Sequence, residues 1–243
     1  MTAAAVIWHE LECGSYGEDL ELWRGLARAS GGPVLDVGAG TGRVTLELAR
    51  HGHTVTAMDL DGDLLARLAA HAVDFPEVST VTADARDFAL ETIFALCIVP
   101  MQTIQLLGGS RQRRAFLACV AGQLRTGGVL AIAIADELEL FDAEADELVV
   151  APLPDVCERD GIVYCSRPTA IRERDGGFVL ERRRETVTAG GELTVELDAV
   201  ALDGLSVETL EREGADAGLE PSGRVVIPAT DDYVSSVVVT FRA

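Results

Sequence analysis

The stretch VLDVGAGTG, residues 34–42, constrains the fold more than any other part of the chain. It begins as an apolar run interrupted by Asp36, and glycines follow at positions 38, 40 and 42. An apolar strand that ends in a glycine-rich turn and continues into a helix is typical of the first crossover of a doubly wound sheet. Glycines at such a turn let a ligand approach the backbone closely. The stretch therefore predicts an α/β fold and a nucleotide-like ligand, whose identity it leaves open.

The chain up to residue 135 continues as an alternation of strands and helices. Strands are predicted at residues 34–37, 54–58, 78–82, 94–99 and 129–135. Helices are predicted at residues 17–29, 41–50, 63–72 and 111–124. Strands that alternate with helices at this rhythm indicate a parallel sheet covered on both faces.

The pattern changes after Ala135. Residues 136–157 are acidic and are predicted to be irregular, and three strands are then predicted at 162–173, 178–188 and 193–202. Their joints are rich in glycine, as hairpin turns between antiparallel strands require. The arginines of this region alternate with glutamates, which favours solvated hairpin strands over a basic binding strip. These arginines are Arg172, Arg174, Arg182, Arg183 and Arg184.

A helix at 206–217 and strands at 224–227 and 233–241 complete the predicted order. The fold class expected is a Rossmann-like, doubly wound, seven-stranded α/β sheet with an antiparallel β insertion after the fifth strand. We expect four parts in the chain. They are an N-terminal helical cap at 1–32, a cofactor-binding core at 33–144, the insertion at 145–203, and a final helix and two strands at 204–243.

Charge and cysteine content exclude several classes of function. Forty acidic residues oppose 20 arginines, no lysine is present, and the net charge is −20. Such a chain repels phosphate backbones, so no nucleic-acid partner is expected. Five scattered cysteines without a CxxC pair predict no metal site and favour a reducing cytoplasm. The apolar runs are too short to cross a bilayer, so no membrane partner is expected either.

Three acids are predicted to meet at the carboxyl ends of adjacent strands. Asp36 would repel a phosphate but suits a ligand with ammonium or sulfonium charge. Asp59 ends the second strand, where a carboxylate accepts hydrogen bonds from ribose hydroxyls. Asp84 follows the third strand, where its carboxylate can accept a hydrogen bond from the exocyclic amine of an adenine. Together with the glycines, the acids outline one cleft.

The motifs in four collinear segments resemble those of class I S-adenosylmethionine-dependent methyltransferases. The segments are residues 34–68, 83–88, 94–107 and 124–134. The resemblance implies S-adenosyl-L-methionine as cofactor and S-adenosyl-L-homocysteine as product. In related enzymes an N-terminal tyrosine closes over the cofactor. The cofactor-binding residues that the resemblance implies are Tyr16, Asp36, Gly38, Ala39, Gly40, Gly42, Asp59, Leu60, Asp84, Ala85, Val99 and Pro100.

The sequence gives fewer indications of the methyl acceptor than of the cofactor. Where many small-molecule relatives have Gln-His-Leu, this chain has Gln105 followed by two leucines, so the usual histidine is replaced by Leu106. The segment around Pro100 lacks the Asn/Asp-Pro-Pro-aromatic motif of enzymes that methylate nucleobase or glutamine amides. The residues predicted to contribute to catalysis or to orient an acceptor are His9, Tyr16, Gln102 and Gln105.

We therefore expect a cytoplasmic methyltransferase that acts on an amine or hydroxyl of a small molecule. A sulfonium is already an activated methyl donor, so proximity and orientation suffice, with little or no general base. The insertion is expected to roof the acceptor pocket or to form a homodimer surface. Two alternatives stay open: a non-catalytic, cofactor-binding regulatory or partner protein, and an aminopropyltransferase-like enzyme.

Overall fold

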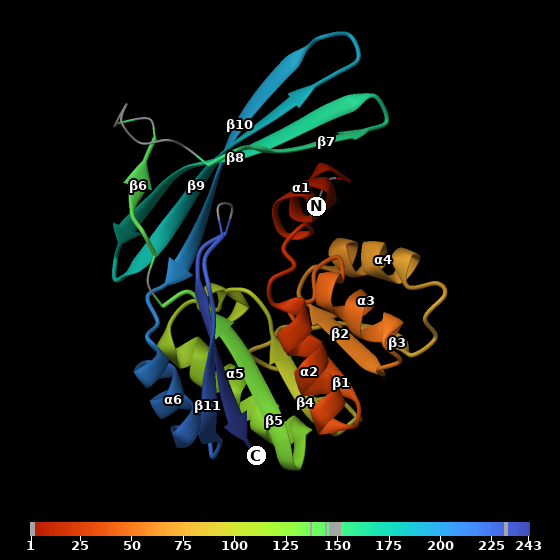
Figure 1. Cartoon of the computed structure of the whole chain (residues 1–243), viewed down its shortest axis with the longest axis vertical. Helices are drawn as coiled ribbons and strands as arrows, with labels where there is room; N and C mark the ends of the chain where they lie inside the picture. The colour runs from red at the N-terminus through yellow and green to blue at the C-terminus, as the bar shows by residue number, and fades with distance from the viewer. Residues whose placement is uncertain (1–2, 137, 144, 146–151, 231–232) are drawn as a thin grey trace.

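The computed structural model describes residues 3–136, 138–143, 145, 152–230 and 233–243 and contains two sheets (Figure 1). The larger sheet has seven strands in the order β11-β12-β5-β4-β1-β2-β3. Strands β1 to β5 are parallel, and β12 is antiparallel to both of its neighbours. The strands are β1 (Val34–Val37), β2 (Val55–Asp59), β3 (Val78–Thr82), β4 (Phe94–Val99), β5 (Leu124–Ile134), β11 (Glu220–Ile227) and β12 (Ser236–Arg242). The predicted Rossmann-like fold is confirmed.

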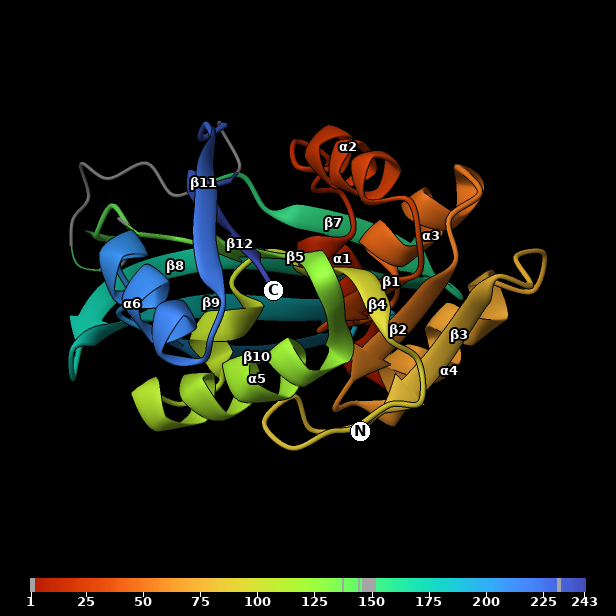
Figure 2. The ribbon, with the colours of Figure 1, turned by 90° about the horizontal axis from the view of Figure 1, so that it is seen from below.

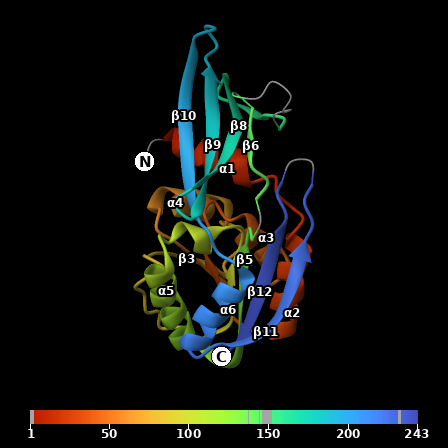
Figure 3. The same ribbon diagram turned by 90° about the vertical axis from the view of Figure 1, so that its left-hand side faces the viewer.

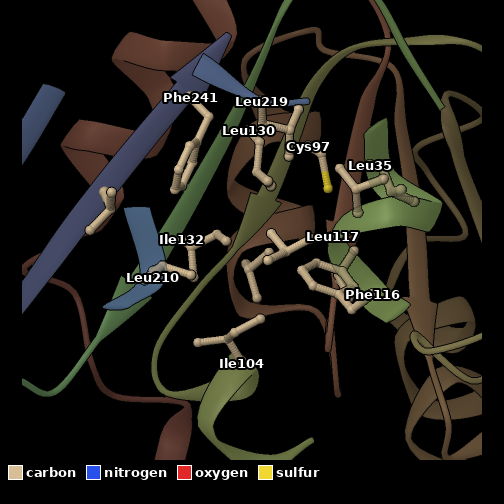
Figure 4. Packing of buried hydrophobic residues seen from close by; sticks show 14 of the residues in the cluster. Leu35, Cys97, Ile104, Phe116, Leu117, Leu130, Ile132, Leu210, Leu219 and Phe241 are labelled. Carbon is tan, nitrogen blue, oxygen red and sulfur yellow. The ribbon is translucent and has the colours of Figure 1, made fainter. Parts of the chain in front are cut away.

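Helices cover both faces of this sheet (Figure 2). One face packs against α2 (Leu20–Ser30), α3 (Arg43–Arg50) and α4 (Gly62–His71), and the other against α5 (Ser110–Gln123) and α6 (Val207–Asp216). Phe116, Leu117 and Leu210 bury their side chains against Leu130 and Ile132 of β5 (Figure 4). On the other face of β5, Val129, Ala131 and Ala133 belong to a second hydrophobic cluster. Because both faces are buried, the strand reads as the unbroken hydrophobic run by which it was predicted.

The second sheet is the predicted antiparallel insertion, but it has five strands instead of three. These are β6 (Phe141–Asp142), β7 (Asp155–Arg159), β8 (Ile162–Arg174), β9 (Gly177–Val187) and β10 (Leu193–Asp203). Their order is β10-β9-β8-β6, and β7 also pairs with β8. The prediction of irregular structure at 136–157 was wrong for β6 and for the start of β7. Both strands are short and acidic, and they form by pairing with one edge of β8. Residues 137, 144 and 146–151 lie outside the described residues.

Several element boundaries differ from the prediction because pairing extends past the apolar runs. β5 begins at Leu124, which pairs with Phe94, whereas Val129 pairs with Leu96. The residues between them bulge outward, and Gly127 has a φ of 73°. Residues 125–128 therefore form a bulge inside the strand. β11 likewise begins at Glu220, four residues before the predicted strand.

The insertion lies over the carboxyl ends of the parallel strands, and α1 (Ala3–Cys13) lies between the insertion and the core (Figures 1 and 3). α1 contacts β7, β8 and α4, and β10 contacts the short 3-10 helix η1 (Thr103–Leu106) that follows β4. This arrangement brings the glycine turn, η1 and the inner face of the insertion to one region. Across the described ranges, no helix combines the length and the apolar character that crossing a bilayer requires.

Candidate cofactor and acceptor site

The glycine turn between β1 and α3 adopts a conformation that favours glycine at all three positions. Gly38, Gly40 and Gly42 have φ values of 72°, 55° and 93°, in the left-handed region that L side chains rarely adopt. Space is restricted as well. A Cβ on Gly38 would lie 2.4 Å from Thr103 Cγ2, and one on Gly40 would lie 2.3 Å from His9 Cε1. Backbone conformation and the close packing of Thr103 and His9 therefore both require glycine at these positions.

Asp36 lies beneath this turn and is 1% exposed. Thr45 donates a hydrogen bond to Oδ2 over 2.6 Å, and Oδ1 is buried without a partner among the described residues. Burial raises the pKa of this carboxyl to about 6. A buried carboxylate with an unused acceptor atom carries a substantial desolvation cost and is characteristic of a functional site.

Asp59 lies at the end of β2, directly opposite the turn. Its Oδ2 accepts the backbone N–H of Gly40 over 2.8 Å, and its Oδ1 accepts that of Asp61 over 2.9 Å. Each carboxylate oxygen retains a second lone pair, so both can still accept ribose hydroxyls. Leu60, the next residue, is 67% exposed and offers an apolar surface beside this acid.

Asp84 and Ala85 follow β3, the neighbour of β2 in the sheet. Arg86 forms a forked ion pair with Asp84, at 2.6 Å for its shortest hydrogen bond. This guanidinium lowers the pKa of the Asp84 carboxyl to about 2. Ala85 packs against the edge of the main hydrophobic cluster. Arg86 was not predicted from the sequence, although its place two residues after Asp84 permits this pairing.

On the opposite side of the turn, Val99 and Pro100 are buried where β4 ends. Met101 follows with a φ of 55°, a strained conformation for a non-glycine residue that is common at functional sites. Thr103 holds the bend by donating from Oγ1 to the Pro100 carbonyl over 3.0 Å. A small cavity of about 50 Å³ opens beside this bend. Its lining residues are Tyr16, Asp19, Met101, Gln102, Ala133, Tyr233, Val234 and Ser236.

Tyr16 enters the cavity from the loop between α1 and α2. Its ring lies 4.8 Å from that of Tyr233, and the Arg43 guanidinium lies 5.0 Å from its centroid. Arg43 also donates to the Tyr16 carbonyl and to both carboxylate oxygens of Asp19, which is 1% exposed. Burial raises the pKa of the Tyr16 hydroxyl. The buried Asp19–Arg43 pair, which the sequence analysis missed, thus fixes the loop that carries Tyr16.

His9 extends from α1 onto the glycine turn. Its Nδ1 lies 3.4 Å from Thr41 Oγ1, and its ring lies against Gly40. Burial lowers the pKa of the imidazole, against the neighbouring Asp59, which raises it. The lowered pKa favours the neutral ring, in which one nitrogen donates and the other accepts.

The structure separates the two glutamines that were predicted to orient an acceptor. Gln102 lines the cavity, and its side chain makes no hydrogen bond among the described residues. Gln105 is 1% exposed, and its amide binds the backbone N–H and C=O of Ala135 and the carbonyl of Asp203. The environment of Gln105 indicates a structural role.

The arginines of the insertion also differ from the prediction. Arg174 is solvated, with a side-chain exposure of 75%, as expected. The expectation was wrong for Arg182 and Arg184, whose side chains are 13% and 18% exposed. Both carry charges on the buried side of the sheet, where Arg184 pairs with Glu12 of α1. Alternation along a strand places every second side chain inward, and α1 supplies the acidic partner.

Residues 34–128 match the family model described as a methyltransferase domain. The motifs recognised in the sequence lie inside or directly beside this range. Residues 34–128 thus match a methyltransferase domain, in agreement with the resemblance that the motifs carry. Within the described residues, no cluster of histidine, cysteine, aspartate or glutamate side chains could hold a metal ion.

Solved structures share the fold over the whole chain. The S-adenosylmethionine-bound amino pentose methyltransferase CalS10 from Micromonospora echinaspora, involved in calicheamicin biosynthesis, is 20% identical, with a TM-score of 0.73 and coverage of 100% of this chain and 98% of that one. The sugar N-methyltransferase KedS8 from Streptoalloteichus sp. is 18% identical, with a TM-score of 0.73 and coverage of 100% and 94%. The glycopeptide N-methyltransferase MtfA with bound S-adenosyl-L-homocysteine is 22% identical, with a TM-score of 0.62 and coverage of 100% and 98%. Comparison with curated proteins gave no match.

Proposed function

We propose that this protein transfers a methyl group from S-adenosyl-L-methionine to an amine of a small molecule. The observation that carries the proposal is the acid-flanked glycine turn of the methyltransferase domain, with Asp36 beneath it and Asp59 bonded to Gly40. The choice of an amine is supported by the structural relatives, which are named as methyltransferases of an amino pentose, a sugar nitrogen and a glycopeptide nitrogen.

The residues around the turn fit this cofactor. Asp59 has free lone pairs for the ribose hydroxyls, Leu60 offers an exposed apolar face for the adenine, and Asp84 with Ala85 lies at the next strand end. We place the methionine portion beside the glycine turn, where Thr103 and His9 lie against Gly38 and Gly40, and Tyr16 would close that side. When bound, S-adenosyl-L-methionine supplies a methyl group activated by its sulfonium.

The contribution of this chain to the reaction is orientation. The strained backbone at Met101 turns the segment after β4 so that Gln102 lines the cavity with Tyr16. A free amide oxygen at Gln102 can accept an N–H of a neutral amine and aim its lone pair. Such positioning accounts for a large part of the rate of a bimolecular transfer. The neutral His9 imidazole would add at most modest proton acceptance.

The proposal includes the surroundings of the reaction. The insertion would roof the acceptor cleft, because its β10 contacts η1 beside the cavity and its β7 and β8 contact α1. With a net charge of −20 the chain suits a small acceptor rather than a nucleic acid. We place the enzyme in the cytoplasm, in keeping with five unpaired cysteines.

The test has two stages. Calorimetric titration with S-adenosyl-L-homocysteine should show binding to the unmodified protein, at least about tenfold weaker binding to Asp59→Asn because a ribose-binding charge is lost, and unchanged binding to the exposed control Asp74→Asn. Absence of binding to the unmodified protein would refute the proposal. Incubation with cofactor and a panel of small amines and alcohols, followed by mass spectrometry, should then show amines that gain one methyl group. Methylated alcohols alone would contradict the choice of an amine, and tight binding without any product would favour the non-catalytic alternative.

A further inference from the structure

α1 carries a residue that covers the cofactor turn. The His9 ring lies so close to Gly40 that no Cβ could be accommodated there, and the N–H of Gly40 is bonded to Asp59. The position of α1 therefore decides whether the turn and its ribose-binding acid are covered. The contacts that hold α1 in place can therefore affect the affinity for the cofactor.

Glu12, three residues after His9, attaches α1 to the insertion. Arg184 of β9 donates from Nε and NH2 to the two carboxylate oxygens of Glu12, each over 2.7 Å. Ser166 of β8 donates from Oγ to the same carboxylate over 2.7 Å. The Glu12 side chain is 11% exposed and Ser166 is fully buried. A forked, charge-assisted pair of this kind is both strong and directional.

Aromatic contacts reinforce the same attachment. Trp8 lies one helical turn before Glu12 and therefore faces the same side. Its ring meets Tyr164 of β8 edge-on, with centroids 5.2 Å apart, and the Arg184 guanidinium lies 5.5 Å from its centroid. His9, next in sequence to Trp8, points to the core instead. α1 thus has one face fixed to the insertion and another lying on the cofactor turn.

A second attachment reaches the core. Glu10 accepts a hydrogen bond from Arg67 of α4 over 2.7 Å and also pairs with Arg159 of β7. This contact ties α1 to an element of the cofactor domain as well as to the insertion. α1 is therefore a physical link between the two sheets, which Figure 3 also shows.

We propose that Glu12 is a positioning residue that couples the insertion to cofactor binding. Through Arg184 and Ser166 it fixes α1 against the insertion, and α1 in turn holds His9 over Gly40. The inference rests on the proposed function, because it requires the cofactor at this turn. We take His9 to form one wall of the cofactor site, so that docking of α1 favours cofactor binding; because coupling is reciprocal, cofactor binding then favours docking of α1.

The first test measures affinity for S-adenosyl-L-homocysteine by calorimetry. Glu12→Gln and Arg184→Gln should each weaken binding by about tenfold, a usual size for such coupling. The double variant should bind no more weakly than Arg184→Gln, because Arg184→Gln already breaks the pair with Glu12, together with the Arg184–Asp198 pair of 3.0 Å. Arg172→Gln is the matched control: its ion pairs with Asp142 and Glu181 lie on the same sheet, and no contact with α1 is present among the described residues. Its affinity should match that of the unmodified protein.

The second test separates positioning from simple stabilisation. In hydrogen exchange, amides of α1 should become more protected when S-adenosyl-L-homocysteine binds to the unmodified protein and to Arg172→Gln, but not to Glu12→Gln. If Glu12→Gln exposes amides of β8 and β9 and retains full affinity, Glu12 only stabilises the insertion and the inference is overturned. Arg184→Lys keeps the charge but loses the fork, so it should bind with intermediate affinity. If Glu12→Gln and Arg184→Lys both bind S-adenosyl-L-homocysteine as tightly as the unmodified protein does, the inference is overturned. If the unmodified protein does not bind S-adenosyl-L-homocysteine, the proposed function is overturned instead.

Discussion

Replacing Gln105 with leucine is expected to destabilise the whole protein rather than to affect acceptor binding alone. The Gln105 side chain is 1% exposed. Its Nε2 donates to the carbonyls of Ala135 and Asp203 over 3.1 and 3.0 Å, and its Oε1 accepts the Ala135 N–H over 2.8 Å. One side chain thus joins η1 to the end of β5 and to the end of β10. No other partner replaces it when the amide is removed.

The magnitude follows from these three hydrogen bonds. Each neutral hydrogen bond contributes about 1 kcal/mol net, and each buried backbone group left without a partner costs about 1–3 kcal/mol. Leucine at this position should therefore cost about 3–5 kcal/mol, against a usual total stability of about 5–15 kcal/mol. For a chain of this length, a loss of about 3 kcal/mol lowers the melting temperature by roughly 6–12 °C.

The assay compares Gln105→Leu with Gln102→Leu by urea unfolding and thermal denaturation. The Gln102 side chain lines the cavity and has no hydrogen bond among the described residues, so its replacement should change stability by less than about 0.5 kcal/mol. It should instead raise KM for the acceptor. If Gln105→Leu unfolds like the unmodified protein, the structural role given to this amide is wrong.

Three further outcomes are expected. Gly40→Ala should weaken S-adenosyl-L-homocysteine binding by at least about tenfold in calorimetry, because a Cβ would lie 2.3 Å from His9 and the φ is +55°. The control Gly52→Ala, also at positive φ but in open space, should leave binding unchanged. Asp36 has a folded-state pKa of about 6 against an ordinary value of 3.8, so between about pH 4 and 6 the folded state binds more protons and the free energy of unfolding falls as pH rises. Asp36→Asn should remove this fall of about 3 kcal/mol. Identical pH profiles of unfolding for the variant and the unmodified protein would contradict this expectation. Arg43→Gln leaves the buried Asp19 carboxylate without its partner and should lower the free energy of unfolding in urea by about 3–5 kcal/mol. Arg24→Gln breaks the more exposed pair with Glu47 and should lower it by less than about 1 kcal/mol. Equal losses in the two variants would contradict the difference in burial.

The glycine turn and the strand that precedes it could be placed from sequence because each of these parts is local. A buried strand, three alternate glycines and a helix occupy 17 consecutive residues, 34–50. Asp59 could be placed because it directly follows an apolar strand. Chain order and the right-handed crossover rule then bring these strand ends together without knowledge of any side-chain contact.

The acceptor side could not be predicted, because its contacts join distant parts of the chain. Tyr16 meets Tyr233, and Gln105 binds the carbonyl of Asp203. Neither pair leaves a spacing that a pattern could reveal. α1 is a similar case: it has no acidic residue in its first turn and no basic residue in its last, so the usual signals of a helix end are missing. Its partners, Ser166 and Arg184, lie more than 150 residues away.

The partners of the charged side chains could not be predicted from composition either. Composition predicts a strongly acidic surface, and the alternation of arginines with glutamates favoured solvated strands. The structure instead uses arginine for ties between elements that meet far apart in sequence: Arg43 with Asp19, Arg184 with Glu12, and Arg113 with Glu213. In a chain without lysine, the planar guanidinium can hold a carboxylate at two points and tolerate burial.

These buried ion pairs should respond to salt differently from the exposed Arg86–Asp84 pair. The Arg113–Glu213 pair, with exposures of 5% and 2%, is shielded from ions, whereas the Arg86–Asp84 pair is exposed. Raising salt should therefore leave the buried ties intact while it screens the mutual repulsion of the surface acids. Since a net charge of −20 opposes compaction, added salt is expected to stabilise this protein rather than to weaken it. A fall in unfolding free energy between low and moderate ionic strength would show that exposed pairs, not buried ones, dominate its electrostatics.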